Sequence, residues 1–197
     1  MLEENSNWRI PLITNDTKMQ ALIGAAMEAG FTHAAPLKAE TLRFLPEVRE
    51  MCNADRCHHY NTNWMCPPAC GTLGECAAKA VGFNEGIIVQ SVGDVEDSFD
   101  IEAMERIEKQ HKKRFQDLAA ALGTAYPRIL ALGAGSCDLC PSCTYPDAPC
   151  RFPDKALSSM EANGLWVSDV CEKNGVPYNY GSNKMAFTSC ILVSDEE

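Results

Sequence analysis

The chain has 197 residues, a formal net charge of −10 at pH 7 and eleven cysteines. Its length suits one domain, and a core of that size does not need cysteine cross-links in order to fold. The negative charge argues against a nucleic-acid partner, because phosphate binding requires lysine and arginine clustered on one face.

The pattern of apolar residues predicts the following elements in chain order: a helix over 15–30, a strand over 31–37, a helix over 39–52, a strand over 85–92, a helix over 99–122, a strand over 128–135, short helices over 154–164 and 167–175, and a closing strand over 185–194. The basic run at 109–114 falls within the long helix and is interpreted as its solvated face.

These elements predict the fold class. Strand 85–92, helix 99–122 and strand 128–135 indicate a β-α-β unit with parallel strands. We therefore expect an α/β or α+β fold, a single domain over 1–197, with a small mixed sheet that contains this unit. Two cysteine-rich loops, 52–76 and 137–150, are expected to gather at one end of the sheet.

The amino terminus predicts the compartment. It has neither the basic nor the apolar region of a secretory signal, and no apolar run in the chain is long enough to span a bilayer. We therefore expect a cytoplasmic protein without a membrane partner. Thiols in a reducing cytosol are not kept as structural disulfides, so metal binding is favoured over a disulfide framework.

The second loop, "SCDLCPSCTYPDAPC", places Cys137, Cys140 and Cys143 in consecutive C-x-x-C steps and Cys150 seven residues later. Three thiolates so spaced can wrap one corner of an iron-sulfur cube, and a more distant cysteine can complete it. Cys150 serves either this cluster or a neighbouring one. Zinc is the alternative, but zinc sites usually use two C-x-x-C pairs separated by a longer span.

The first loop offers five thiols for a site that needs four. We favour Cys52, Cys57, Cys66 and Cys70 as ligands and keep Cys76 as the alternative. Cys66 begins a C-P-P-A-C segment, and a proline after a ligand cysteine turns the chain away from a cluster. Two four-thiol loops predict two 4Fe-4S clusters.

Several further residues receive structural interpretations. His58 and His59 are interpreted as hydrogen-bond donors beside the ligand cysteines, or as exposed side chains, rather than as ligands. Trp64 and Tyr60 are interpreted as side chains that shield the site from water. Cys171 and Cys190, in a predicted helix and strand, are interpreted as small buried apolar residues. The catalytic alternative is a substrate pocket formed by Arg151, Met160 and Glu161. The structural interpretation is that Ser158, Ser159 and Glu161 cap a short helix and that Met160 is a core residue.

Three patterns together carry a resemblance: C-x8-C-P-P with Trp64 two residues before the second cysteine, C-x-x-C-x-x-C-x6-C-R-x-P, and "SSMEANG" before a terminal strand. From about residue 50 to its end, the chain resembles a family of cysteine-rich predicted metal-binding proteins of unknown function, found largely in anaerobic bacteria and archaea. The resemblance implies metal binding, and its cysteine pattern implies two cubane-type clusters in a compact cytoplasmic protein.

The functional hypotheses differ in how completely each cluster is ligated. Two fully ligated clusters near the surface predict a ferredoxin-like electron carrier that serves a partner redox enzyme. A cluster in which one iron has no protein ligand predicts an enzyme that acts on a small molecule. The abundance of thiols is also compatible with a zinc-binding structural protein, or with a cluster-dependent scaffold or redox sensor.

Overall fold

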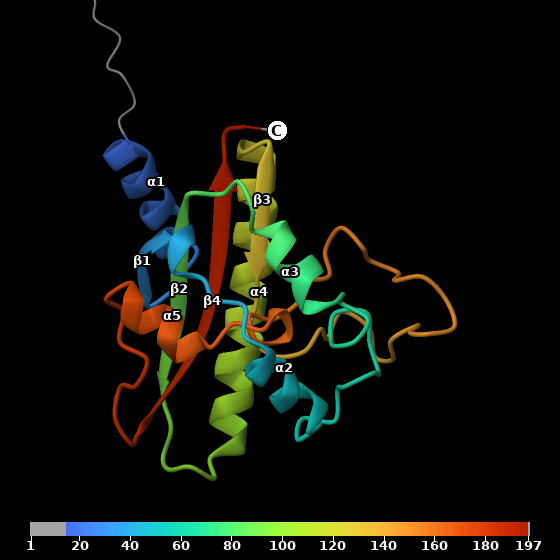
Figure 1. Ribbon diagram of the computed structural model, residues 1–197. Coiled ribbons are helices and arrows are strands. Elements are labelled where there is room, and N and C mark those ends of the chain that lie inside the picture. Colours follow the sequence, from blue (N-terminus) through green and yellow to red (C-terminus); the bar gives the residue numbers. More distant parts are fainter. Residues whose placement is uncertain (1–14, 197) are drawn as a thin grey trace, which may run out of the picture.

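The computed structural model describes residues 15–196, so the expectation of no secretory signal falls largely on residues 1–14, outside the described part (Figure 1). The elements are α1 (Asn15–Glu28), β1 (His33–Lys38), the 3-10 turn η1 (Ala39–Thr41), α2 (Pro46–Asn53), α3 (Leu73–Lys79), β2 (Glu85–Asp94), α4 (Ile101–Ala125), β3 (Arg128–Leu132), the 3-10 turn η2 (Glu161–Asn163), α5 (Val167–Lys173) and β4 (Lys184–Ser194).

The four strands form one sheet in the order β1-β2-β4-β3, and every neighbouring pair is antiparallel. The α+β class is confirmed, but the expected mixed sheet is wrong. Strands β2 and β3, which precede and follow α4 in the chain, do run in the same direction, since both are antiparallel to β4. The carboxy-terminal strand lies between them, so the β-α-β unit is split.

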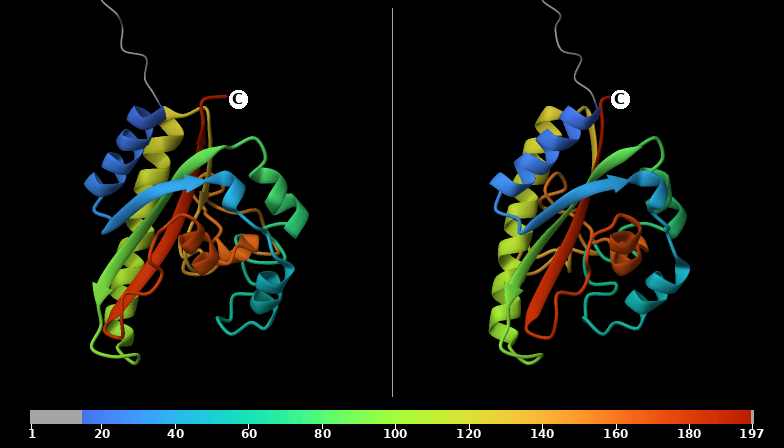
Figure 2. Two further views of the ribbon diagram at one scale, coloured as in Figure 1. Left: turned by 60° about the vertical axis from the view of Figure 1, so that its left-hand side comes forward. Right: turned by 90° about the vertical axis from the view of Figure 1, so that its left-hand side faces the viewer.

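The two faces of the sheet carry different layers (Figure 2). Helices α1 and α4 pack on one face, where Ile87 and Val89 of β2 meet Leu22 and Phe115. The other face carries α5 and the η2 segment, and there Ile88 belongs to a separate core cluster. Alternate residues of β2 are therefore buried on opposite faces, which explains why its sequence is a continuous apolar run rather than an alternating one.

Helix α4 is amphipathic, as its pattern predicts. It buries Ile107, Phe115 and Leu118. Lys109 and Lys113, from the basic run, are exposed and pair with acidic residues four positions away on the same helix. Within residues 15–196, no helix combines the length and the apolar character that a membrane span needs.

Two predicted helices are wrong in extent. The helix expected over 39–52 is interrupted at 42–45, because the residue before a proline disfavours helical backbone and Pro46 instead begins α2. The helix expected over 154–164 is reduced to η2. Residues 153–155 form a turn, residues 156–158 have no regular secondary structure, and Ser159 forms a parallel bridge with Gly133.

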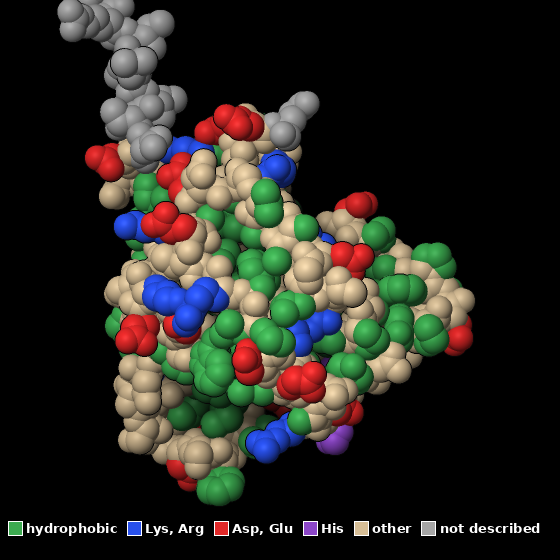
Figure 3. Space-filling model, in the orientation of Figure 1, with side chains coloured by type: hydrophobic (Ala, Val, Ile, Leu, Met, Phe, Trp, Pro, Cys, Tyr) green, Lys and Arg blue, Asp and Glu red, His purple; other side chains and the backbone are tan. Residues whose placement is uncertain are grey.

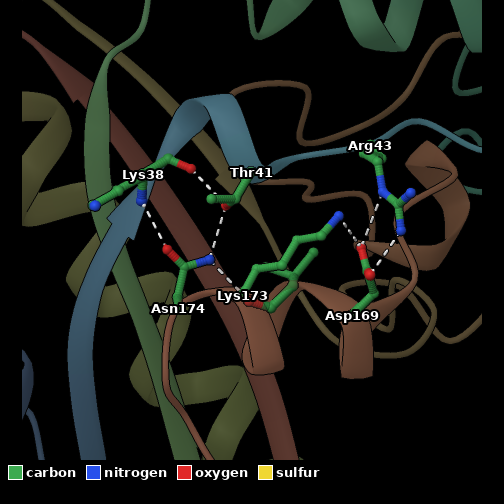
Figure 4. Close-up of polar contacts among 7 residues, drawn as sticks. Lys38, Thr41, Arg43, Asp169, Lys173 and Asn174 are labelled. Atoms are coloured by element: carbon green, nitrogen blue, oxygen red, sulfur yellow. Dashed lines mark hydrogen bonds and ion pairs between the residues drawn. The ribbon is translucent and has the colours of Figure 1, made fainter.

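Polar contacts fasten α5 to the segment that follows β1 (Figure 4). The backbone N–H of Lys38 donates to Asn174 Oδ1 at 3.0 Å, and Asn174 Nδ2 donates to Thr41 Oγ1 at 2.8 Å. Asp169 accepts from both Arg43 and Lys173. These bonds fix the chain that leads from the sheet into α2, on which the first cysteine of the first loop lies.

Candidate metal centre

The second cysteine loop surrounds a cavity of about 200 Å³, here called the second-loop cavity. It is lined by Cys137, Cys140, Cys143 and Cys150, all half-buried. Two bonds fold the loop back on itself: Thr144 Oγ1 donates to the carbonyl of Pro149 at 2.8 Å, and Arg151 Nη1 donates to the carbonyl of Ser142 at 2.7 Å. Cys150 therefore lies with the three cysteines of its own loop.

The first cysteine loop borders a second cavity of about 230 Å³, here called the first-loop cavity. Cys52, Cys57 and Cys66 line it. Cys52 is in the last turn of α2, and the chain beyond it turns sharply through left-handed residues at Asp55, His58 and Asn61. Asp and Asn tolerate that conformation better than other side chains do, so the sequence suits the turns that bring the three thiols together.

Cys70 and Cys76 form a pair of their own beside this cavity. Arg49 Nη1 lies 3.6 Å from Cys70 Sγ and 3.7 Å from Cys76 Sγ. The same guanidinium donates to the carbonyls of Ala162 at 2.6 Å and Gly71 at 2.8 Å. Arg49 thus joins α2, the first loop and the η2 segment around two buried sulfurs.

Burial raises the pKa of these thiols, whereas a nearby positive charge lowers it. A hydrogen bond from Cys76 and the nearby Arg49 guanidinium lower the pKa of Cys70 to about 6. Burial raises the pKa of Cys66 to about 11 and also raises the pKa of Cys52 and of Cys137. A metal or cluster that binds the buried thiols must therefore displace their protons.

The three residues of the catalytic alternative do not line one cavity. Met160 is fully buried in the core, as its structural interpretation predicts. Arg151 lines the second-loop cavity and Glu161 the first-loop cavity. Ser159 Oγ accepts from the N–H of Ala162 at 3.0 Å, although the residue at the N-cap of η2 is Met160 and makes no side-chain cap.

Three of the aromatic residues and histidines expected near the sites lie against them, and His58 does not. Trp64 lines the second-loop cavity and Tyr60 the first-loop cavity. His58 is exposed, whereas His59 is half-buried and lines both cavities. Cys171 and Cys190 are fully buried in the core, which confirms their interpretation as small apolar residues.

The described side chains do not converge on a single ion. Among residues 15–196, no group of three His, Cys, Asp or Glu side chains is arranged to hold one metal ion. The cysteines instead surround cavities several times larger than the roughly 30 Å³ that one water molecule occupies in the liquid.

Arg49 and the double role of His59 were missed from the sequence. The only signal for Arg49 was its place three residues before Cys52, which puts it one helical turn away. Nothing in the local pattern indicates that its guanidinium reaches Cys70 and Cys76, since that contact depends on how α2 and α3 pack.

These features define a cysteine-rich α+β protein whose loops offer thiols for metal binding. The chain belongs to the family described as predicted metal-binding protein (DUF2284), whose model matches residues 35–193. No match was found among curated proteins, and none among solved structures.

Proposed function

We propose that this protein binds two iron-sulfur clusters of the 4Fe-4S type and transfers electrons to or from a partner redox enzyme. The observation that carries the proposal is the second-loop cavity, which four cysteines of one short loop line together. Thiolates are the protein ligands of iron-sulfur clusters, and the number of thiols fits one cubane cluster.

The size of the cavities favours a cluster over zinc. Four sulfurs around one zinc ion each lie about 2.3 Å from it, which leaves no open space between them. The second-loop and first-loop cavities measure about 200 and 230 Å³. A cluster would supply the electron-accepting chemistry, while Trp64 and Tyr60 would shield it from water.

The position of the loops supports electron transfer. The cysteines of the second-loop cavity are half-buried, and Cys57 of the first loop is exposed, so a bound cluster would lie near the surface. Figure 3 shows apolar side chains over the lobe that these loops form. Trp64, Met65 and Pro149 line an open groove of about 580 Å³ there, beside Cys70 and Cys150. This face could receive a partner protein.

Metal analysis tests the proposal. Protein prepared without oxygen should contain about eight irons and eight acid-labile sulfides. Cys140→Ser should remove or convert one cluster, whereas Cys190→Ser, at a buried cysteine outside both cavities, is the matched control and should leave the iron content unchanged. Stoichiometric zinc without labile sulfide would overturn the proposal.

An enzyme with an open iron is the second candidate, and one observation favours it. The first-loop cavity is lined by three cysteines and Glu161, while Cys70 faces Arg49 and Cys76. Cys70→Ser separates the two candidates. Loss of the first cluster would identify Cys70 as the fourth ligand, as we expect. A retained cluster whose EPR signal changes when cyanide is added would identify an open iron.

A further inference from the structure

The two cysteine cavities share one wall. His59 lines both of them. Gly135 and Ser136 line the first-loop cavity, and the next residue, Cys137, lines the second-loop cavity. The cavities therefore adjoin each other at residue 59 and at residues 135–137.

Contacts between the two loops hold this wall in place. Tyr145 Oη donates to Asn61 Oδ1 at 2.7 Å, and Trp64 Nε1 donates to the carbonyl of Ala148 at 3.1 Å. The rings of Trp64 and Tyr145 meet edge to face with centroids 4.9 Å apart. Residues from the two loops, far apart in the chain, are thus bonded directly, so the two loops form one unit.

Gly135 also constrains the wall. Its φ of +69° is a conformation that glycine adopts without strain, and a Cβ there would lie 2.6 Å from Glu108 Oε1. The absence of a side chain lets this backbone, which runs along the first-loop cavity, lie closely against Glu108 and Lys112 of α4.

His59 is the residue of the wall that can interact with the contents of either cavity. Within residues 15–196, its ring has no hydrogen-bond partner, although the side chain is half-buried. A histidine ring always carries at least one N–H donor. Donors directed at cluster sulfurs are among the factors that set the reduction potential of a cluster.

We propose that the two sites act as one two-electron unit, in which an electron passes directly between neighbouring clusters and His59 is a positioning residue in the wall between them. This inference rests on the proposed function. The step moves one electron: one cluster is oxidised, the other is reduced by the same electron, and no proton or further reactant is needed. An external reductant or partner supplies each electron that enters the pair.

EPR of the fully reduced protein tests the proximity of the clusters. Protein first shown by chemical analysis to hold about eight irons is reduced with excess dithionite. We expect a broadened spectrum with spin-spin splitting that integrates to two spins, while Cys140→Ser, with one cluster, gives a simple spectrum of one spin. If the two-cluster spectrum is only the sum of independent one-cluster spectra, the inference is wrong although the proposed function stands. Protein without iron and sulfide would instead refute the proposed function.

A potential measurement tests His59. His59→Phe keeps a ring of similar size and removes both nitrogens, so it should retain both clusters and their splitting but lower the midpoint potential of at least one cluster. His33→Phe is the control, since His33 is exposed on β1 and lines neither cavity. Unchanged potentials in His59→Phe, or equal shifts in both variants, would overturn the role of His59.

Discussion

Arg49 contacts both the first loop, at Cys70 and Gly71, and the η2 segment, at Ala162. Replacing it by methionine leaves the carbonyls of Ala162 and Gly71 without their donor. Buried groups that lose a charged partner typically cost about 1–3 kcal/mol each, so Arg49→Met should lower the free energy of unfolding by about 2–4 kcal/mol. Denaturant titration of the metal-loaded protein measures this change.

Arg43→Met is the matched control for Arg49→Met. Arg43 is more than half exposed and its ion pair with Asp169 lies at the surface. Pairs of that kind contribute about 0–1 kcal/mol. Equal losses of unfolding free energy in the two variants would show that the contacts of Arg49 with the first loop stabilise the fold no more than a surface ion pair does.

His111 gives the fold a dependence on pH. Its ring is buried between Ser91 Oγ at 3.0 Å and Ser189 Oγ at 2.7 Å. Burial, with the nearby Arg114 and Lys112 charges, lowers the pKa of His111 to about 3. The unfolded chain, with an ordinary histidine pKa near 6.5, therefore binds the extra proton first as the pH falls.

The stability that neutral His111 contributes is thus complete above about pH 6.5 and is lost progressively toward pH 3. Between pH 7 and pH 5 the loss should be about 2 kcal/mol. We expect His111→Gln to have a shallower decrease in unfolding free energy over this range than the wild type, whereas His33→Gln, at an exposed position, should keep the wild-type slope. Identical slopes in all three proteins would contradict the prediction.

At the scale of single elements, Gly86 fixes the pairing of β2 with β4. A Cβ at this position would overlap the carbonyl oxygen of Ile191 on the neighbouring strand. Gly86→Ala should therefore push the two strands apart and lower the free energy of unfolding by at least about 2 kcal/mol. Thermal and denaturant unfolding measure the change.

Gly74→Ala is the control at the same level. Gly74 lies in helix α3, and nothing is within 4 Å of the Cβ that the substitution adds. Alanine favours a helix over glycine by about 0.5–1 kcal/mol, so this variant should be slightly more stable than the wild type. A destabilisation equal to that of Gly86→Ala would show that crowding in the sheet is not the cause.

The sequence predicts these elements to different extents, and for physical reasons. Helix α4 follows from its helical periodicity, and strands β2 and β4 follow from continuous apolar runs of strand length. The placement of β4 between β2 and β3 could not be predicted, since a local pattern does not show which strand pairs with which. The helix expected over 154–164 fails because Ser158 and Met160 form backbone hydrogen bonds with Gly133, which follows the end of β3.

The candidate site divides in the same way. The repeated C-x-x-C spacing in the second loop indicated three cysteines around one site and left the place of Cys150 open, whereas in the structure all four line one cavity. The shared wall at His59 and the contacts of Arg49 result from the packing of loops that lie far apart in the chain. The spacing within a loop can be read from the sequence, but the distance between loops depends on the whole fold.

At the scale of the whole molecule, both cysteine loops lie together next to α2 and α3, to the right of the sheet in Figure 1. The formal charge of −10 is carried by the chain alone, and bound thiolate-ligated clusters would add to it. Around the open groove the charges are mixed, because Lys79 and Asp147 both line it. Attraction of a partner should therefore come from the net charge rather than from one acidic patch.

This leads to a prediction for electron transfer. The reduced protein should pass electrons to a basic cytochrome at a rate that falls as ionic strength rises, because salt screens the attraction between opposite net charges over about 10 Å at 0.1 M. Stopped-flow measurement at two salt concentrations gives the rates. An uncharged quinone serves as the control acceptor, and its rate should not depend on salt. A rate to the cytochrome that is constant or rises with salt would refute electrostatic docking and leave the assignment of the clusters intact, because that assignment depends on iron, sulfide and the cysteines of the two loops.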